Sequence, residues 1–204
     1  METLLGLFVG IGLSAACGFR IFVPLLGMSI ASMTGHIHLS AGFDWIGTWP
    51  ALTALAAATT LEVGAYYVPW VDHLMDTAAT PAAIIAGTIV TASMAGDISP
   101  FLKWALAAIA GGGVAGIVQL GTVATRGASL AATGGVGNIL VSTTELVGSV
   151  VMTLLAIIVP IICAAAVAWL CYKMIARVIA SPVLRPQRKG SSYATDADRA
   201  KGEA

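Results

Sequence analysis

Charged residues are scarce in this sequence of 204 residues. Only 10% of its residues are Asp, Glu, Lys or Arg, whereas soluble domains carry about 25% because their surfaces face water. Hydrophobic residues make up 58% of the chain, and the mean hydropathy is +0.92. This balance excludes an ordinary soluble domain and indicates an integral membrane protein.

Basic residues are nearly absent from the first 172 positions. Seven of the ten Lys and Arg residues lie from Lys173 onward. Residues 1–172 therefore offer no basic face interleaved with aromatic residues, and no nucleic-acid partner is predicted.

Cysteine and histidine are too few for a metal centre or a disulfide framework. Cys17, Cys163 and Cys171 lie in apolar runs, without a CxxC pair or a histidine at ligand spacing. We expect three buried free thiols, no metal and no cofactor. The sequence contains no HExxH motif and no recognisable Ser, His and Asp arrangement, so an enzyme is not predicted.

Five apolar regions are candidates for entering a bilayer, which a helix crosses with about 20 residues. They are residues 3–33, 49–68, 81–95, 101–125 and 144–172. The first is interrupted by Gly18, Arg20 and Pro24, and the last is expected to kink or tilt at Pro160. The third and fourth are rich in small residues, which let helices pack closely. The predicted fold is an all-α, polytopic bundle of transmembrane helices, some of them broken or re-entrant.

Glycine and alanine recur at an offset of 100 residues. Gly12 matches Gly112 and Gly27 matches Gly127, among other pairs. Within a transmembrane domain of residues 1–180, this pattern predicts two inverted repeats, 1–80 and 101–180, joined by a short helix at 81–97. Because Gly and Ala are common throughout, chance matches are the alternative explanation.

The end of the chain is polar and basic. Residues 181–204 are predicted to form a disordered tail. Lys173 and Arg177 flank the last apolar region and place the C-terminus in the cytoplasm. Counting back through the five regions then places the acidic connection 71–80 outside. The first apolar region follows Met1-Glu2-Thr3 without a basic segment, so we expect it to be retained rather than cleaved as a signal peptide.

Arg20 is the first candidate for a functional residue. An ionisable side chain at membrane depth costs at least about 2.5 to 3.5 kcal/mol. Gly18 and Pro24 break the helix on either side of Arg20, and the amides that a break leaves unpaired favour an anion or a carboxylate. Arg20 is therefore predicted to contact an anionic ligand or, alternatively, to snorkel or to pair with a buried acid such as Glu62 or Glu145.

Further candidates for substrate or ion binding lie within or near three other apolar regions. They are Glu62, Tyr66, Arg126, Asn138 and Glu145. Tyr66 follows Glu62 by one helical turn, so the two could share a hydrogen bond, although Glu62 could equally be solvated at the interface. The glycine-rich segment 133–138 lacks the spacing of a nucleotide-binding loop, and residues 142–145 after it are typical of a capped helix start.

A cluster of Asp72, His73 and Asp76 follows the second region. The two carboxylates would share one helical face, which suits a hard cation or a proton relay. A solvated helix start, capped by its own Asp, is the more common role of such a cluster. We keep the relay as a hypothesis and predict no metal there.

Three stretches carry a resemblance to a known family. They are residues 16–25, 61–72 and 132–138, which include Arg20, Glu62 and Asp72. Together they resemble a bacterial family of small membrane proteins known as domain of unknown function 4126. The resemblance covers nearly all of residues 5–172 and implies a multi-pass protein of the bacterial inner membrane, without a known activity. The family's glycine-rich motif is typically followed by Asn-Pro, whereas Asn138 precedes Ile139 here.

Broken helices and the buried Arg20 and Glu62 favour a small transporter or channel for an unidentified solute or ion, assembled as a homo-oligomer. Arg20 would contact an anionic group, and Glu62 would couple protons or cations.

In the alternative, Arg20 and Arg126 bind lipid phosphates in a structural protein whose partners are membrane lipids. A third interpretation, an intramembrane enzyme, requires Asp72 and its neighbours His73 and Asp76 to meet in a cavity.

Overall fold

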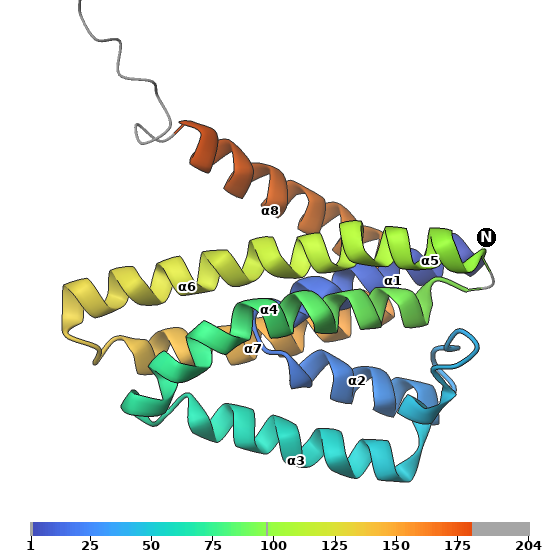
Figure 1. Cartoon of the computed structure of the whole chain (residues 1–204), viewed down its shortest axis with the longest axis horizontal. Helices are drawn as coiled ribbons and strands as arrows, with labels where there is room; N and C mark the ends of the chain where they lie inside the picture. The colour runs from blue at the N-terminus through green and yellow to red at the C-terminus, as the bar shows by residue number, and fades with distance from the viewer. Residues whose placement is uncertain (1, 97, 181–204) are drawn as a thin grey trace, which may run out of the picture.

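The computed structural model describes residues 2–96 and 98–180, except for the side chains of 2, 69–76, 178 and 180. Within these residues it is a bundle of helices without a strand (Figure 1). The elements are α1 (Glu2–Cys17), α2 (Phe22–Met33), the short 3-10 helix η1 (Asp44–Gly47), α3 (Trp49–Ala65), α4 (Pro69–Met94), α5 (Pro100–Leu106), the π-helical segment η2 (Ala107–Gly112), α6 (Gly113–Thr133), α7 (Asn138–Ile158) and α8 (Pro160–Ala180). The predicted tail, 181–204, lies outside the described residues.

Among the described residues, four helical segments are long and apolar enough to cross a membrane. They are Thr77–Met94, Pro100–Thr133, Asn138–Ile158 and Pro160–Arg177. Helices α1 and α2 are shorter apolar helices. The predicted polytopic α-helical membrane fold is therefore confirmed.

Helix α7 shows how this bundle reverses the pattern of a soluble protein. Its buried residues are mostly polar and recur every three or four positions along one face: Ser142, Glu145, Ser149, Thr153 and Ala156. Its exposed face carries large apolar side chains such as Leu140 and Leu154. Lipid tails accept the apolar face, while the polar groups find partners only inside the bundle.

The first apolar region forms a helical hairpin. Helix α1 ends at Cys17, and α2 begins at Phe22 and runs back beside α1, so that the turn between them lies inside the bundle (Figure 1). Gly18 allows this turn to approach α6 closely. A Cβ atom at Gly18 would lie 2.6 Å from Val118 Cβ and 2.7 Å from the Ala115 carbonyl oxygen. Only a residue without a side chain fits there.

Helices α4 and α6 also pack through small residues, as the sequence predicts. A Cβ atom at Gly87 would lie 2.6 Å from Ala115 Cβ and 2.8 Å from the Gly111 carbonyl oxygen. The boundaries of these helices differ from the prediction. Helix α4 begins at Pro69 and contains Pro81, and the next helix runs from Pro100 to Thr133 through the π-helical segment. Pro69 suits the first position of a helix, where its missing N–H has no intrahelical acceptor to lose.

The fifth region is two helices, not one kinked helix. Val159 has φ −134° and ψ 63°, outside the helical range, and Pro160 begins α8. Helix α8 runs back toward the end of the bundle from which α7 came (Figure 1). The fifth region thus supplies two membrane-length helical segments instead of one. The sides of the membrane assigned to the C-terminus and to residues 71–80 stay predictions.

Another expectation is corrected. The connection between α6 and α7 has only four residues, 134–137, with Gly134 and Gly135 at positive φ of 64° and 97°. Residues 142–145 therefore lie inside α7 and do not cap its start. The predicted inverted repeat stays a prediction: at an offset of 100, the turn 18–21 corresponds to 118–121, which lie within α6.

Candidate functional site

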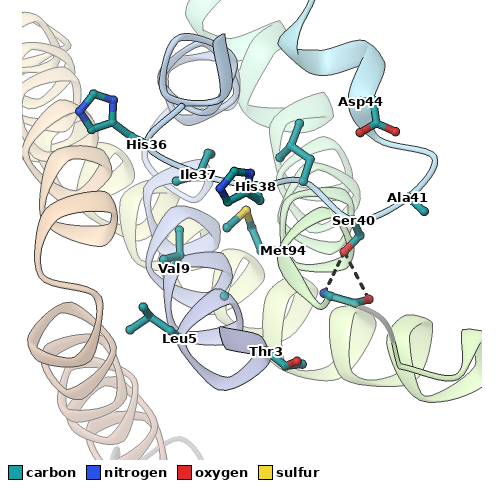
Figure 2. Close-up of a pocket in the computed structure, with 13 residues that line it drawn as sticks. Thr3, Leu5, Val9, His36, Ile37, His38, Ser40, Ala41, Asp44 and Met94 are labelled. Carbon is teal, nitrogen blue, oxygen red and sulfur yellow. Dashed lines mark hydrogen bonds between the residues drawn. The ribbon is translucent and has the colours of Figure 1, made fainter. Parts of the chain in front are cut away.

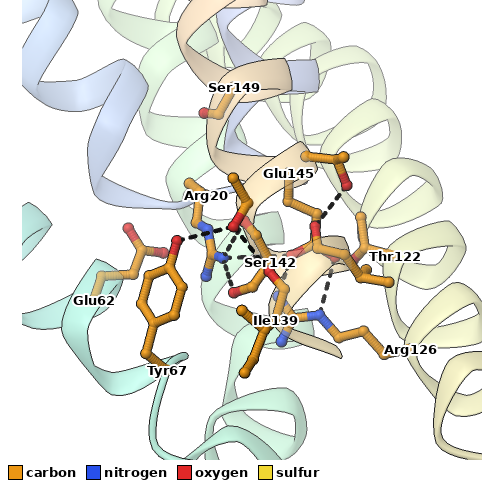
Figure 3. A network of polar contacts seen from close by, with 12 residues as sticks. Arg20, Glu62, Tyr67, Thr122, Arg126, Ile139, Ser142, Glu145 and Ser149 are labelled. Atoms are coloured by element: carbon orange, nitrogen blue, oxygen red, sulfur yellow. Dashed lines mark hydrogen bonds and ion pairs between the residues drawn. The ribbon is translucent and has the colours of Figure 1, made fainter. Parts of the chain in front are cut away.

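Four charged side chains meet inside the bundle, although they come from distant parts of the chain. Arg20 lies in the α1–α2 turn, Glu62 near the end of α3, Arg126 on α6 and Glu145 on α7 (Figure 3). Each side chain is at most 5% exposed, and no other charged side chain that the structure describes is buried. We call these four residues the charge cluster. Its formal charges, two positive and two negative, are balanced.

Glu145 is the centre of the charge cluster. Its Oε1 accepts a hydrogen bond from Arg126 Nε at 2.9 Å, and its Oε2 accepts a second from Arg126 Nη2. The same Oε2 lies 3.6 Å from Arg20 Nη2. The ion pair between Arg20 and Glu145, one of the alternatives predicted for Arg20, is thus present. One carboxylate serves two guanidinium groups.

The hydrogen bonds and the ion pair of Arg20 all involve one of its nitrogen atoms, Nη2. Its Nη2 donates to the Ser142 carbonyl oxygen at 2.9 Å and to Ser142 Oγ at 2.6 Å. Nε and Nη1 are buried and have no hydrogen-bond partner within the described part of the chain. Buried polar atoms of folded proteins nearly always have such partners, so an unsatisfied N–H group calls for a physical explanation.

Tyr66, which follows the end of α3, lies against both guanidinium groups. The centre of its ring is 3.9 Å from Arg20 Cζ and 4.0 Å from Arg126 Cζ. The negative face of an aromatic ring attracts cations, most strongly where water is excluded. Tyr66 thereby offsets part of the repulsion between two arginines that share one carboxylate.

Glu62 caps helix α2 from another helix. Its Oε1 accepts from the Ile21 amide at 2.7 Å and its Oε2 from the Phe22 amide at 3.0 Å. Helix α2 has no acid in its own first turn, so the carboxylate supplies the negative charge that a helix N-terminus favours. The sequence predicted that these amides would attract an anion or a carboxylate, but it did not identify Glu62 as the source.

Sequence reasoning missed two serines that complete the surroundings of the turn. Ser142 binds Arg20, and Ser149 Oγ donates to the Ala16 carbonyl oxygen at 3.1 Å, at the end of α1. Their regular spacing with Glu145 on one face of α7 is the signal that could have found them. Asn138 begins α7, about one turn before Ser142.

The proposed relay of Asp72, His73 and Asp76 falls on the first part of α4. The side chains of 69–76 lie outside the described residues, so the positions of these three groups relative to the charge cluster stay a hypothesis.

A pocket of about 640 Å³ lies away from the charge cluster, where the loop after α2 crosses the start of α1 (Figure 2). Its lining includes His36, His38 and Asp44 from the loop, and Val9 and Met94 from α1 and α4. Both histidines are exposed, as expected for a solvated loop. None of the four charged residues of the cluster lines this pocket.

An apolar exterior around a buried charge cluster defines a polytopic α-helical membrane protein. The chain belongs to the family described as Domain of unknown function (DUF4126), which matches residues 7–179. No curated protein and no solved structure matches the chain.

Proposed function

We propose that this protein is a transporter or channel for a small anionic solute and that Arg20 contacts the solute. The observation that carries the proposal is that two buried nitrogen atoms of Arg20, Nε and Nη1, lie at a helix break and have no hydrogen-bond partner among the residues that the structure describes. Transporters commonly bind their substrates at discontinuous helices, where backbone and charged groups face a protected interior. Arginine suits an anion because its guanidinium group stays charged and presents several donors.

The alternative, a protein that binds lipid phosphates, fits this geometry less well. Arg20 is 1% exposed and Arg126 is 4% exposed, and both guanidinium groups contact Glu145. A lipid headgroup would have to enter the bundle to reach them. Native mass spectrometry that found a phospholipid retained by the parent and lost from an Arg20 variant would favour this alternative over transport.

Uptake into vesicles tests the proposal. The purified protein in liposomes should take up radiolabelled acetate, chloride or phosphate, and Arg20→Ala should lower uptake by about tenfold or more, because a hydrogen bond to a charged group contributes about 1.5 to 3 kcal/mol. Lys103→Ala is the matched control, since it removes a cation from α5, outside the cluster. The control should retain the parent rate.

The outcome that contradicts the proposal is equally definite. An Arg20→Ala protein that remains folded, judged by its elution as a single species, and moves every tested solute at the parent rate would assign Arg20 to structure alone.

A further inference from the structure

The N-terminus of α2 and Arg20 form one site with two kinds of donor. Helix α2 has twelve residues, and its Ile21 and Phe22 amides point at the Glu62 carboxylate. Arg20, 1% exposed, immediately precedes these amides in the chain, and its Nε and Nη1 have no hydrogen-bond partner among the described residues. In the view of Figure 3 the Tyr67 hydroxyl lies between the Glu62 carboxylate and the Arg20 guanidinium group, and no hydrogen bond is drawn between Glu62 and Arg20. Helix N-terminal amides and guanidinium groups both bind oxyanions.

The helix that supplies Glu62 buries fewer residues than the other helices around the cluster. Helix α3 lies at the edge of the bundle beside α2 (Figure 1), and Ala51 and Glu62 are its buried residues. Helix α7, which supplies Glu145, buries five residues, and Glu145 is bound through both oxygens to Arg126. Of the two carboxylates, Glu62 therefore has the smaller network to break when it leaves.

We infer that Glu62 occupies the position of the substrate and that a small carboxylate with one negative charge replaces it at the Ile21 and Phe22 amides, moving the end of α3 outward. This inference rests on the proposed function and names its substrate class and its moving part. Without Glu62 the cluster holds two guanidinium groups and one carboxylate. One monovalent anion restores the balance, whereas a divalent anion exceeds it.

The direct test is calorimetric titration of sodium acetate into the purified full-length protein, with acetamide as the uncharged control ligand. Glu62→Gln keeps the shape of the side chain and an oxygen that accepts an amide N–H, but it removes the competing charge. In the parent, acetate binds only those molecules whose site is not filled by Glu62, and the apparent affinity scales with their fraction. If Glu62 fills the site in about nine molecules of ten, Glu62→Gln should bind acetate about tenfold more tightly than the parent. Asp44→Asn removes an exposed carboxylate at the other end of the bundle and should leave the affinity unchanged.

A second measurement does not depend on the variant folding. Spin labels replacing Leu61 on α3 and Leu140 on α7, both 73% exposed, report the distance between the two helices. The background carries alanine in place of the three native cysteines, which are buried. Saturating acetate should lengthen this distance in the parent, and acetamide should not. Glu62→Gln should show the longer distance at lower acetate concentrations.

Titration with octanoate distinguishes two sources of the carboxylate group, a soluble carboxylate and a fatty acid. Binding of acetate identifies a soluble carboxylate, and binding of octanoate without acetate identifies a fatty acid from the membrane. Either result supports the inference when Glu62→Gln strengthens the binding.

The failures of the two proposals are distinguishable. Equal carboxylate affinities of Glu62→Gln and the parent, or an α3–α7 distance that saturating carboxylate does not change, would overturn this inference while uptake that depends on Arg20 still stood. Uptake that does not depend on Arg20 would overturn the proposed function as well.

Discussion

Replacing Glu145 by Gln is expected to lower the free energy of unfolding by about 3 to 5 kcal/mol, because removing one partner of a buried ion pair leaves an uncompensated charge. Here the change removes the carboxylate that pairs with both guanidinium groups and leaves Glu62 as the remaining buried carboxylate among the described residues. Reversible unfolding in mixed micelles, followed by circular dichroism, measures the loss.

A double variant separates charge balance from shape. Adding Arg126→Gln to Glu145→Gln removes the one positive charge that Glu145→Gln leaves unbalanced, so the double variant should be more stable than Glu145→Gln alone. Such strong non-additivity is typical of residues in one network. If the losses of unfolding free energy in Glu145→Gln and Arg126→Gln simply added in the double variant, Glu145 and Arg126 would act independently. That result would contradict the geometry of their two hydrogen bonds.

The second large effect is expected at Gly18. Gly18→Ala should destabilise the protein by about 1 to 3 kcal/mol, since an added methyl group would press against a backbone carbonyl that has little room to move. Its contacts would be the Ala115 carbonyl oxygen and the Val118 side chain. The same unfolding assay measures the change.

Gly148 supplies the matched control. It lies within α7, and a Cβ atom there would meet nothing within 4 Å. Gly148→Ala should therefore stabilise the protein by about 0.5 to 1 kcal/mol, the usual gain of alanine over glycine inside a helix. Changes of the same sign at both positions would mean that close packing against α6 is not what requires glycine at position 18.

Much of the architecture follows from composition and from the spacing of apolar runs. Scarcity of charge predicted the membrane fold, and the small residues around Gly87 and Gly111 predicted close helix packing. Helix boundaries were harder to predict. Pro160 is compatible with either a kink or a turn, and only the backbone of Val159 shows a turn. That single difference gives two membrane-length helices where the sequence predicted one.

The charge cluster was predictable in its members but not in its pairings. Burial cost alone selects Arg20, Glu62, Arg126 and Glu145, because few charges occur in the apolar regions. Which carboxylate meets which cation depends on how the helices face one another, and a single sequence does not contain that information. Glu62 binds backbone amides, which carry no side-chain signature at all.

The geometry explains why the charges gather at the helix break. A break inside a membrane leaves amides and carbonyl groups without intrahelical partners, and each must be satisfied within the protein. Glu62 satisfies the start of α2, and Ser149 satisfies a carbonyl at the end of α1. Buried donors and acceptors are thus assembled where water is excluded, and such a place suits a solute that must shed its hydration shell.

A pair of structures of the protein, determined with and without acetate, provides the decisive test, because the difference between them locates the anion. We expect the acetate carboxylate within hydrogen-bond distance of Arg20 and of the Ile21 and Phe22 amides, with the Glu62 side chain displaced. Acetate found only in the pocket beside His36 and His38, with Glu62 still bound to both amides, would overturn this assignment.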